Sequence, residues 1–279
     1  MTADSRRRCA VLGSPITHSL SPVLHRAAYR ATGLDWSYDA CEVREADLGS
    51  FIDDLDESWR GLSLTMPLKR AVVPLAAELS EPARLAHAAN TLILDGSRRI
   101  AYNTDIPGAA AAIRERVTGS IESAVILGGG ATATGVLLAL ADLGCRNLTV
   151  VVRDASRAQD TLAAAERHPD RPYVVIAGFD ASPIVADILV STIPVDVQAT
   201  LALPLAEQIP VIFDVVYDPW PTALGYYART EARILVSGMD LLVHQACGQF
   251  TLMTGIEDAP LEAMRDAGER ALAERASAQ

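Results

Sequence analysis

The sequence has few aromatic residues and no excess of basic ones. Phe, Trp and Tyr make up 5% of its 279 residues, and 24 Lys and Arg stand against 35 Asp and Glu, a formal net charge of -11. A nucleic-acid-binding surface needs Lys and Arg to neutralise phosphates, so this balance argues against a nucleic-acid partner. No apolar run approaches the ~20 residues that a membrane span requires. We therefore expect no membrane partner either.

Cysteine is also scarce, with four residues far apart in the chain: Cys9, Cys41, Cys145 and Cys247. Their spacing matches no metal-ligand pattern, so we predict no metal site and expect free thiols. The three arginines near the N-terminus precede an apolar run that Gly13 and Pro15 interrupt, unlike the core of a signal peptide. A reducing, cytoplasmic location is the expectation that follows.

Half of the residues are hydrophobic, and short apolar runs alternate with helical patterns along most of the chain. Runs that are apolar throughout, such as 150–152, are typical of a parallel sheet covered on both faces. We predict strands at 9–13, 36–43, 61–66, 91–94, 124–127, 148–152, 173–177, 188–191, 211–215 and 234–236. Helices are predicted at 22–32, 46–55, 107–117, 134–143, 157–167, 239–254 and 261–276. This alternation predicts an α/β fold with a doubly wound domain.

The strand–helix rhythm restarts near residue 124, which predicts two domains. The first is an α/β substrate-binding and catalytic domain with a mixed, mainly parallel sheet, formed by residues 1–106 plus 239–279. It is discontinuous because we expect the last helix to return to it. The second, residues 107–238, is predicted to be a Rossmann-like dinucleotide-binding domain.

A glycine-rich turn stands between a predicted strand and a predicted helix. The strand 124–127 runs into Gly128, Gly129, Gly130, Ala131, Thr132 and Ala133. Glycines let the backbone approach a pyrophosphate, and the helix N-terminus supplies free N–H donors and a positive dipole end. Ala133 occupies the position of the third glycine, where alanine is an accepted substitute. The turn therefore predicts dinucleotide binding, although turns also collect glycine for steric reasons.

The end of the next strand bears on the choice between NAD and NADP. Arg153 follows the strand and Arg157 lies one helical turn further, an arrangement that suits a 2′-phosphate. Asp154 between them could accept the ribose hydroxyls of NAD, pair with an arginine, or cap the following helix together with Ser156. We favour NADP as the cofactor.

Four polar segments elsewhere look out of place for packing. They are the serine loop 14–22, the strand end 61–69, the segment 88–91 and the segment 102–105. Ser21 before Pro22 is a good N-cap arrangement, which is the structural reading of that serine. No such reading accounts for Ser19.

Taken in order with the glycine turn, these segments resemble the shikimate dehydrogenase family over essentially the whole chain. The matching motifs are Ser19-Leu20-Ser21-Pro22, Thr65-Met66-Pro67-Leu68-Lys69, Ala88-Ala89-Asn90-Thr91 and Asn103-Thr104-Asp105. Near the C-terminus, Asp214-Val215-Val216-Tyr217 and the helix from Gly238 to Ala246 add to the likeness. The set is much more specific than any one of its members.

The resemblance implies an NADP-dependent, reversible reduction of 3-dehydroshikimate to shikimate in aromatic amino-acid biosynthesis. It implies Lys69 and Asp105 as the catalytic pair. Substrate-binding residues would be Ser19, Ser21 and Tyr217 for the carboxylate, and Thr65, Asn90, Asp105 and Gln245 for the ring hydroxyls. Cofactor-binding residues would be Gly128 to Ala133, Arg153, Arg157 and Gly238.

Several positions depart from the family pattern. Ser63 replaces the usual Asn of the strand end, and Ile106-Pro107 displaces the glycine that commonly follows the aspartate to Gly108. Val152 replaces the Asn that normally begins the phosphate-binding run, which weakens the NADP prediction. Asp240 stands where many members have a small residue. None of these departures falls on Lys69 or Asp105.

Reducing a ketone requires a hydride from the cofactor and a proton for the developing alkoxide. A lysine ammonium can stabilise that charge and donate the proton, and an aspartate beside it can orient the lysine. His18 and His244 are competitors because histidine titrates near neutrality, but we interpret both as local hydrogen-bonding residues.

Two alternatives stay open. One is a relative that acts on quinate or shikimate with NAD, and the other is a non-catalytic nucleotide-binding regulator on the same fold. Keeping both Lys69 and Asp105 argues against the regulator. Family members occur as monomers and as homodimers, so either state is expected here.

Overall fold

The computed structural model describes residues 7–181 and 184–278. The chain divides into two compact units, which we call unit 1 (residues up to 104, with 245–274) and unit 2 (residues 105–244, with those from 275). The division into functional domains at residues 106 and 239 stays a prediction beside these structural bounds. Within the described part, no helix combines the length and apolar character that crossing a membrane requires.

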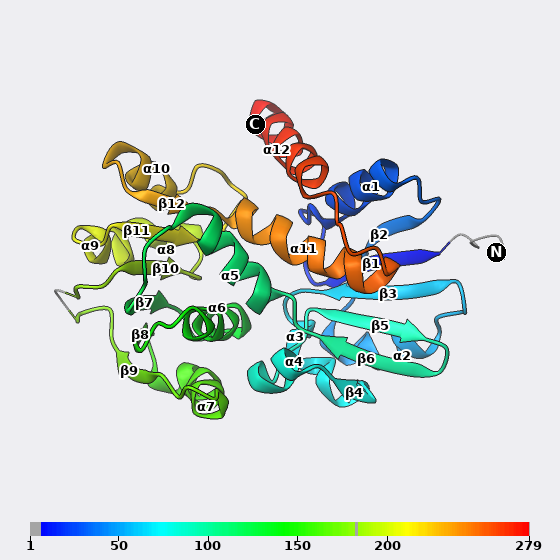
Figure 1. Ribbon diagram of the computed structural model, residues 1–279, viewed down its shortest axis with the longest axis horizontal. Coiled ribbons are helices and arrows are strands. Elements are labelled where there is room, and N and C mark those ends of the chain that lie inside the picture. The colour runs from blue at the N-terminus through cyan, green and yellow to red at the C-terminus, as the bar shows by residue number, and fades with distance from the viewer. Residues whose placement is uncertain (1–6, 182–183, 279) are drawn as a thin grey trace. The chain divides into compact units, whose positions relative to one another are not determined.

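Unit 1 contains a six-stranded mixed sheet in the order β2-β1-β3-β5-β6-β4 (Figure 1). β1 runs parallel to β2 and β3, β5 runs antiparallel to β3 and β6, and β4 pairs parallel with β6. The strands are β1 (Arg8–Gly13), β2 (Ser37–Glu42), β3 (Trp59–Leu64), β4 (Glu78–Leu79), β5 (Thr91–Asp95) and β6 (Arg98–Tyr102).

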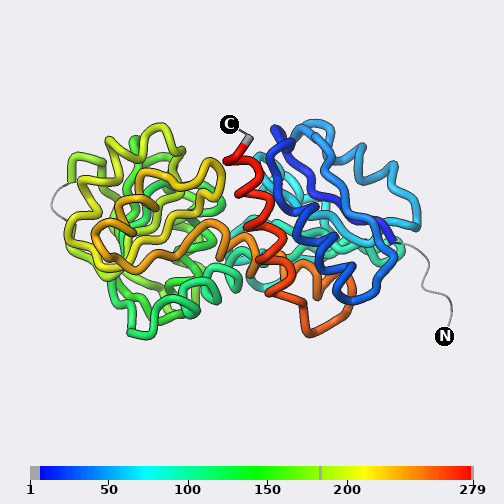
Figure 2. The backbone as a smooth tube through the Cα atoms, turned by 90° about the horizontal axis from the view of Figure 1, so that it is seen from above, coloured from blue at the N-terminus to red at the C-terminus, as the bar shows by residue number. Residues whose placement is uncertain are grey.

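The first helices of unit 1 are α1 (Ser21–Thr32), α2 (Leu48–Asp53), α3 (Leu68–Ala71) and α4 (Glu81–Ala86), with short 3-10 turns at Glu45–Asp47 and Val73–Leu75. Two long helices complete it. α11 (Gly238–Thr254) reaches unit 1 at residue 245, and α12 (Leu261–Ala278) follows. The segment 245–274 therefore lies with the N-terminal elements, as the backbone trace shows (Figure 2).

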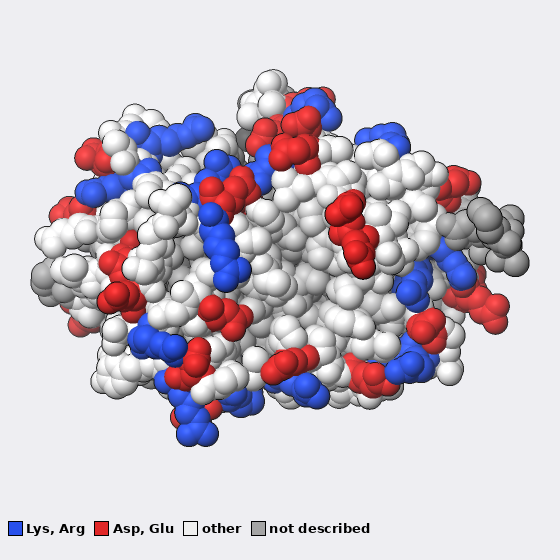
Figure 3. Space-filling model, in the orientation of Figure 1, with Lys and Arg blue, Asp and Glu red and all other residues white. Residues whose placement is uncertain are grey.

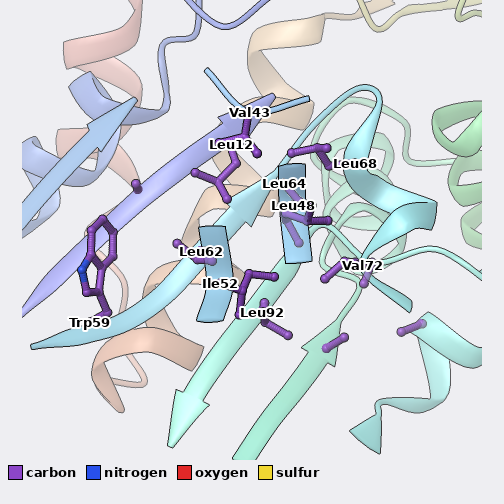
Figure 4. Packing of buried hydrophobic residues seen from close by; sticks show 14 residues of the cluster. Leu12, Val43, Leu48, Ile52, Trp59, Leu62, Leu64, Leu68, Val72 and Leu92 are labelled. Carbon is purple, nitrogen blue, oxygen red and sulfur yellow. The ribbon is translucent and has the colours of Figure 1, made fainter. Parts of the chain in front are cut away.

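One face of this sheet packs a leucine-rich core. Figure 4 shows side chains from the strands meeting those of the neighbouring helices: Leu12, Leu62, Leu64 and Leu92 with Leu48, Ile52, Leu68 and Val72. Each fully buried leucine contributes roughly 1.5–3 kcal/mol of transfer free energy. This packing holds the ends of β1 and β3, where the polar segments begin.

Unit 2 contains a six-stranded, fully parallel sheet in the order β12-β11-β10-β7-β8-β9, the arrangement of a Rossmann-like fold. Its strands are β7 (Ser123–Leu127), β8 (Asn147–Val151), β9 (Tyr173–Ala177), β10 (Ile188–Ser191), β11 (Val211–Asp214) and β12 (Ile234–Val236). Every residue of β10 and β11 is buried, as expected for central strands covered on both faces.

The helices of unit 2 alternate with these strands. They are α5 (Asp105–Arg116), α6 (Ala131–Asp142), α7 (Gln159–Arg167), α8 (Val195–Leu201), α9 (Leu203–Ala206) and α10 (Ala223–Thr230), with a 3-10 turn at Ala155–Ala158 before α7. On the face shown in Figure 3, acidic and basic side chains of the described residues are interspersed.

The predicted α/β class and all ten predicted strands are confirmed. The strands β4 and β6 were not predicted. β6 carries Arg98 and Arg99, which broke the apolar pattern, and it returns from β5 through a tight turn in which Gly96 has a φ of 59°.

Candidate active site

The carboxyl ends of β1 and β3 bring the serine loop beside the lysine-bearing strand end. The Thr65 amide donates to the Leu12 carbonyl at 2.9 Å, and the Ser14 amide donates to the Met66 carbonyl at 3.0 Å. Ligands of open α/β sheets bind at this edge, outside the carboxyl ends of the strands. The serine loop and the segment 65–69 thus start from one edge of the unit 1 sheet.

The serine loop corrects one prediction. α1 begins at Ser21, its N-cap position is Leu20, and no side chain caps it, so the prediction of Ser21 as N-cap is wrong. Instead the Ser21 amide donates to the Ser19 hydroxyl at 3.3 Å. The side-chain acceptor comes two residues earlier than predicted because the helix takes in Ser21. Both hydroxyls lie at the first turn of α1.

Asn90 is the centre of a buried hydrogen-bond network in unit 1, with 2% of its surface exposed. Its Nδ2 donates to the Thr104 hydroxyl at 2.8 Å and to Gln245 Oε1 at 3.2 Å. Its Oδ1 accepts from the Thr104 amide at 2.8 Å. Two predicted substrate-binding residues, Asn90 and Gln245, are therefore in direct contact although they are 155 positions apart.

The two predicted catalytic residues adjoin this network through the backbone. Lys69, half-buried in α3, accepts the Ala89 amide on its carbonyl oxygen at 2.7 Å, one residue before Asn90. Asp105 follows Thr104 directly, begins α5 in unit 2 and is buried. Asn90 thus bonds to Thr104, the residue before Asp105, and its neighbour Ala89 bonds to the backbone of Lys69.

The structure gives His244 a local partner. Its Nε2 lies 2.6 Å from Glu115 Oε2, which confirms the interpretation of His244 as a hydrogen-bonding residue. His18 is exposed in the serine loop.

The cysteines are free thiols, as expected. Burial raises the pKa of the Cys9, Cys145 and Cys247 thiols to about 11, so they stay protonated and unreactive near neutrality. Among the residues that the structure describes, no three His, Cys, Asp or Glu side chains are grouped so that they could hold a metal ion.

In unit 2 the glycine turn is enclosed by its neighbours. Gly128 has a φ of 108°, and its amide donates to the Val151 carbonyl at 2.9 Å. A Cβ at Gly129 would lie 2.3 Å from the Arg157 carbonyl oxygen, whereas one at Gly130 would meet open space. Gly130 is also the N-cap of α6. The open side of the turn is therefore a helix N-terminus with accessible backbone, which fits the pyrophosphate of a dinucleotide.

The residues that bear on cofactor choice lie beyond β8. Arg153 and Arg157 are exposed. Asp154 is the N-cap of the 3-10 turn, and its Oδ1 accepts the Ser156 amide at 2.9 Å. Hydrogen bonds from Ser156 hold the pKa of Asp154 below its usual value. The carboxylate that complicated the NADP prediction thus caps its own helical turn.

The unusual Asp240 also has a structural role. Gly238 begins α11, and Asp240 Oδ2 accepts the amide and hydroxyl of Ser237 at 2.9 and 2.8 Å. Its Oδ1 pairs with Arg116 at 2.7 Å. The departure from the family pattern is therefore a helix cap joined to α5.

Tyr217, half-buried, follows β11 in unit 2. The loop that carries it is anchored by Asp214, which accepts from the Thr222 hydroxyl at 2.5 Å, Gln198 at 3.1 Å and the Val216 amide at 3.2 Å. Burial raises the pKa of Asp214 despite these bonds. The Asp-x-x-Tyr motif thus combines an anchor with the predicted substrate contact.

Sequence reasoning missed the polar residues that stand behind Asn90. Ser63, Tyr38 and Gln249 are buried and hydrogen-bonded to one another or to Asn90. One signal was available, because Gln245 and Gln249 are four apart and so lie on the same side of α11.

Comparison with known proteins supports the family. The family model described as the shikimate dehydrogenase substrate binding domain matches residues 11–92, and that of the shikimate 5'-dehydrogenase C-terminal domain matches residues 238–267. Shikimate dehydrogenase (NADP(+)) of Methanothermobacter thermautotrophicus is 33% identical over 277 residues, covering 94% of this chain and 95% of that protein. The chain belongs to the shikimate dehydrogenase family.

Solved structures of shikimate dehydrogenases share the fold. That of Mycobacterium tuberculosis is 38% identical, with a TM-score of 0.86 over 95% of this chain and 99% of its own. That of Thermus thermophilus in complex with NADP(H) and shikimate is 30% identical, with a TM-score of 0.84 over 95% of this chain and all of its own (100%).

Proposed function

We propose that this protein is an NADP-dependent shikimate dehydrogenase that reversibly reduces 3-dehydroshikimate to shikimate. The observation that carries the proposal is the Asn90 network. In this member of the family, Asn90 contacts Gln245 and Thr104, and its neighbour Ala89 bonds to the backbone of Lys69. Relatives named for this activity, and a family structure holding NADP(H) and shikimate, support the substrate and cofactor.

The substrate would be held by hydroxyl and amide groups of the unit 1 sheet edge. Ser19 and Ser21 at the first turn of α1 would bind its carboxylate, where hydroxyls and the positive end of the helix both favour an anion. Tyr217 would also bind the carboxylate. Thr65, Asn90 and Gln245 would bind ring hydroxyls, with Asp105 as the charged acceptor.

Lys69 would carry the proton. In the direction of reduction, its ammonium donates a hydrogen bond to the ketone oxygen and transfers a proton from Nζ as negative charge develops there. Asp105 would orient Lys69 and an adjacent substrate hydroxyl. In the oxidation of shikimate, neutral Lys69 takes the hydroxyl proton back.

NADPH, when bound, supplies the hydride. The backbone of Gly128 to Ala133 would hold the pyrophosphate, and Gly238 would contribute to cofactor binding. Arg153 and Arg157 would bind the 2′-phosphate, which suits exposed guanidinium groups, while the Asp154 carboxylate caps the 3-10 turn.

Replacing Lys69 tests the catalytic assignment. Lys69→Ala should lower kcat for shikimate oxidation by roughly 10²–10⁴, because the charge acts mainly in the transition state. The dissociation constant for shikimate, measured by calorimetry, should change by less than about tenfold. A variant with near-normal turnover would refute the role of Lys69.

Three finer points belong to the same proposal. The functional domains are residues 1–106 with 239–279, and 107–238. The protein acts in the cytoplasm, as a monomer or a homodimer.

A further inference from the structure

We propose that Gln249 is a positioning residue for the substrate pocket, which it orients through Asn90. The inference rests on the proposed function, because it concerns how a substrate-binding amide is held. Gln249 is buried in α11, one helical turn after Gln245, and belongs to none of the motifs that identified the family.

Gln249 contacts Asn90 in two ways. Its Nε2 donates to the Asn90 backbone carbonyl at 3.0 Å and to the Thr91 hydroxyl at 3.2 Å. The Thr91 hydroxyl in turn donates to Asn90 Oδ1 at 3.0 Å. One side-chain amide of α11 thus holds both the backbone and, through Thr91, the side chain of Asn90.

The orientation of the Gln249 amide is itself determined by residues on the side away from Asn90. Its Oε1 accepts from the Ser63 hydroxyl at 2.8 Å, and Ser63 accepts from the Tyr38 hydroxyl at 2.5 Å. His25 Nε2 lies 3.4 Å from the same Oε1, and the His25 ring stacks on Tyr38 with centroids 4.1 Å apart. With its oxygen held in this way, Gln249 must direct its two N–H donors at Asn90 and Thr91.

The donors form a chain with a single direction. Tyr38 donates to Ser63, Ser63 to Gln249, and Gln249 to Thr91 and the Asn90 carbonyl. At the far end, the Thr104 amide fixes Asn90 Oδ1 as an acceptor, so Nδ2 is the end that faces Gln245. Gln245 therefore presents its oxygen to Asn90 and its N–H groups to other partners.

This series of hydrogen bonds explains why Ser63 stands where the family usually has Asn. The Ser63 hydroxyl already lies between Tyr38 and Gln249 at hydrogen-bond distance from both. A longer amide at position 63 would displace one of them. The short side chain at position 63 leaves the space in which Gln249 reaches Asn90.

The role of Gln249 is testable by separating its donors from its acceptor. Gln249→Glu keeps an oxygen for Ser63 but loses the N–H groups that hold Asn90 and Thr91. Gln249→Met keeps the approximate volume and loses both. Thr254→Val on the same helix is the matched control, because the Thr254 hydroxyl donates to the Phe250 carbonyl and accepts the Ile256 amide, neither of which belongs to the Asn90 network.

Steady-state oxidation of shikimate by the purified full-length chain gives the readout. For Gln249→Glu and Gln249→Met we expect the KM for shikimate to rise about tenfold, since buried acceptors lose their donors, with the KM for NADP⁺ within about twofold. Ser63→Ala removes the donor to Gln249 Oε1 and the acceptor of the Tyr38 hydroxyl but leaves the Gln249 donors in place. It should raise the shikimate KM less, and it serves if the Gln249 variants fail to fold. Thr254→Val should leave both constants unchanged.

A double-mutant cycle separates positioning from a merely structural role. In an Asn90→Ala background, Gln249→Glu should raise the shikimate KM by less than about twofold, because Gln249 then has no side chain to position. Equal effects of Gln249→Glu in both backgrounds, or a lower melting temperature with an unchanged shikimate KM, would overturn the inference. Inactivity of the unaltered protein on shikimate would instead refute the proposed function.

Discussion

The predicted substrate-binding groups of unit 1 and the predicted cofactor-binding groups of unit 2 differ in kind. In unit 1, the predicted substrate-binding groups Asn90 and Gln245 are side chains buried in a hydrogen-bond network. In unit 2, the predicted cofactor site consists of the backbone at Gly128 to Gly130 and the exposed side chains of Arg153 and Arg157.

This difference separates side chains whose orientation depends on the fold from side chains that contribute little to stability. A buried amide whose partners are all defined has one orientation, and losing a partner costs both stability and function. Exposed guanidinium groups contribute little to stability, so they can change with the cofactor at low cost. We therefore expect substitutions on the substrate side to affect folding and activity together, and arginine substitutions on the cofactor side to affect activity alone.

Asn90→Ala should give the largest effect outside the catalytic pair. It removes the partner of the buried Thr104 amide and of Gln245, so the free energy of unfolding should fall by about 2–3 kcal/mol. The KM for shikimate should rise more than about tenfold, with the KM for NADP⁺ nearly unchanged. Denaturant unfolding and initial rates measure the two quantities. An Asn90→Ala variant as stable as the parent would contradict the expected difference between the two units.

His25→Gln should reveal the burial of the unit 1 network through pH. Burial lowers the pKa of His25 from 6.5 to about 4, so its contribution to stability is present above pH 6.5 and is lost as the pH falls towards 4. Glutamine can still reach Gln249 but does not titrate in this range. Unfolding at several pH values should show that the variant loses less stability than the parent on acidification, by up to about 3 kcal/mol. Parallel pH profiles would contradict the burial of a neutral histidine.

Gly129→Ala should weaken cofactor binding, because the added Cβ would meet the backbone carbonyl of Arg157 at 2.3 Å and force the turn to shift. We expect about a tenfold rise in the dissociation constant for NADP⁺, with shikimate binding retained. Gly130→Ala is the control for stability, since its Cβ would meet open space and should leave the melting temperature unchanged. Equal melting temperatures for Gly129→Ala and the parent would show that the turn tolerates the shift.

Arg157→Ala should give the smallest structural effect and a selective functional one. Loss of a guanidinium at the 2′-phosphate should lower kcat/KM for NADP⁺ about tenfold and leave that for NAD⁺ and the melting temperature unchanged.

Asp154→Ala tests whether the Asp154 carboxylate takes part in cofactor choice. Because Asp154 is a cap, its loss should lower the melting temperature slightly without changing the ratio of NADP⁺ to NAD⁺ use. A loss of NAD⁺ use in Asp154→Ala would assign that carboxylate to the ribose.

The sequence predicted the elements better than the contacts between them. The apolar runs located all ten predicted strands, but the polar Arg98 and Arg99 at the start of β6 concealed that strand. Ser21 before Pro22 matched an N-cap pattern, but α1 begins at Ser21 itself, and no side chain caps it. Helix ends differ by one residue without a change of sequence pattern, so capping roles are easily misassigned.

The candidate site shows the same limit. Motifs named Lys69, Asn90, Asp105 and Gln245, because their spacing along the chain is readable. The contact of Ser63 with Gln249 joins residues 186 positions apart, and no local pattern signals it. Which buried polar groups meet is decided by tertiary packing, and only the folded chain shows it.

The most direct test of the account is a four-way comparison of turnover by the unaltered protein. Shikimate or quinate is supplied with NADP⁺ or NAD⁺, and formation of the reduced nicotinamide is followed by absorbance. The account predicts that shikimate with NADP⁺ gives the highest kcat/KM, by about tenfold or more over each other pair. Preference for quinate with NAD⁺, or tight NADP⁺ binding without turnover of either substrate, would contradict it.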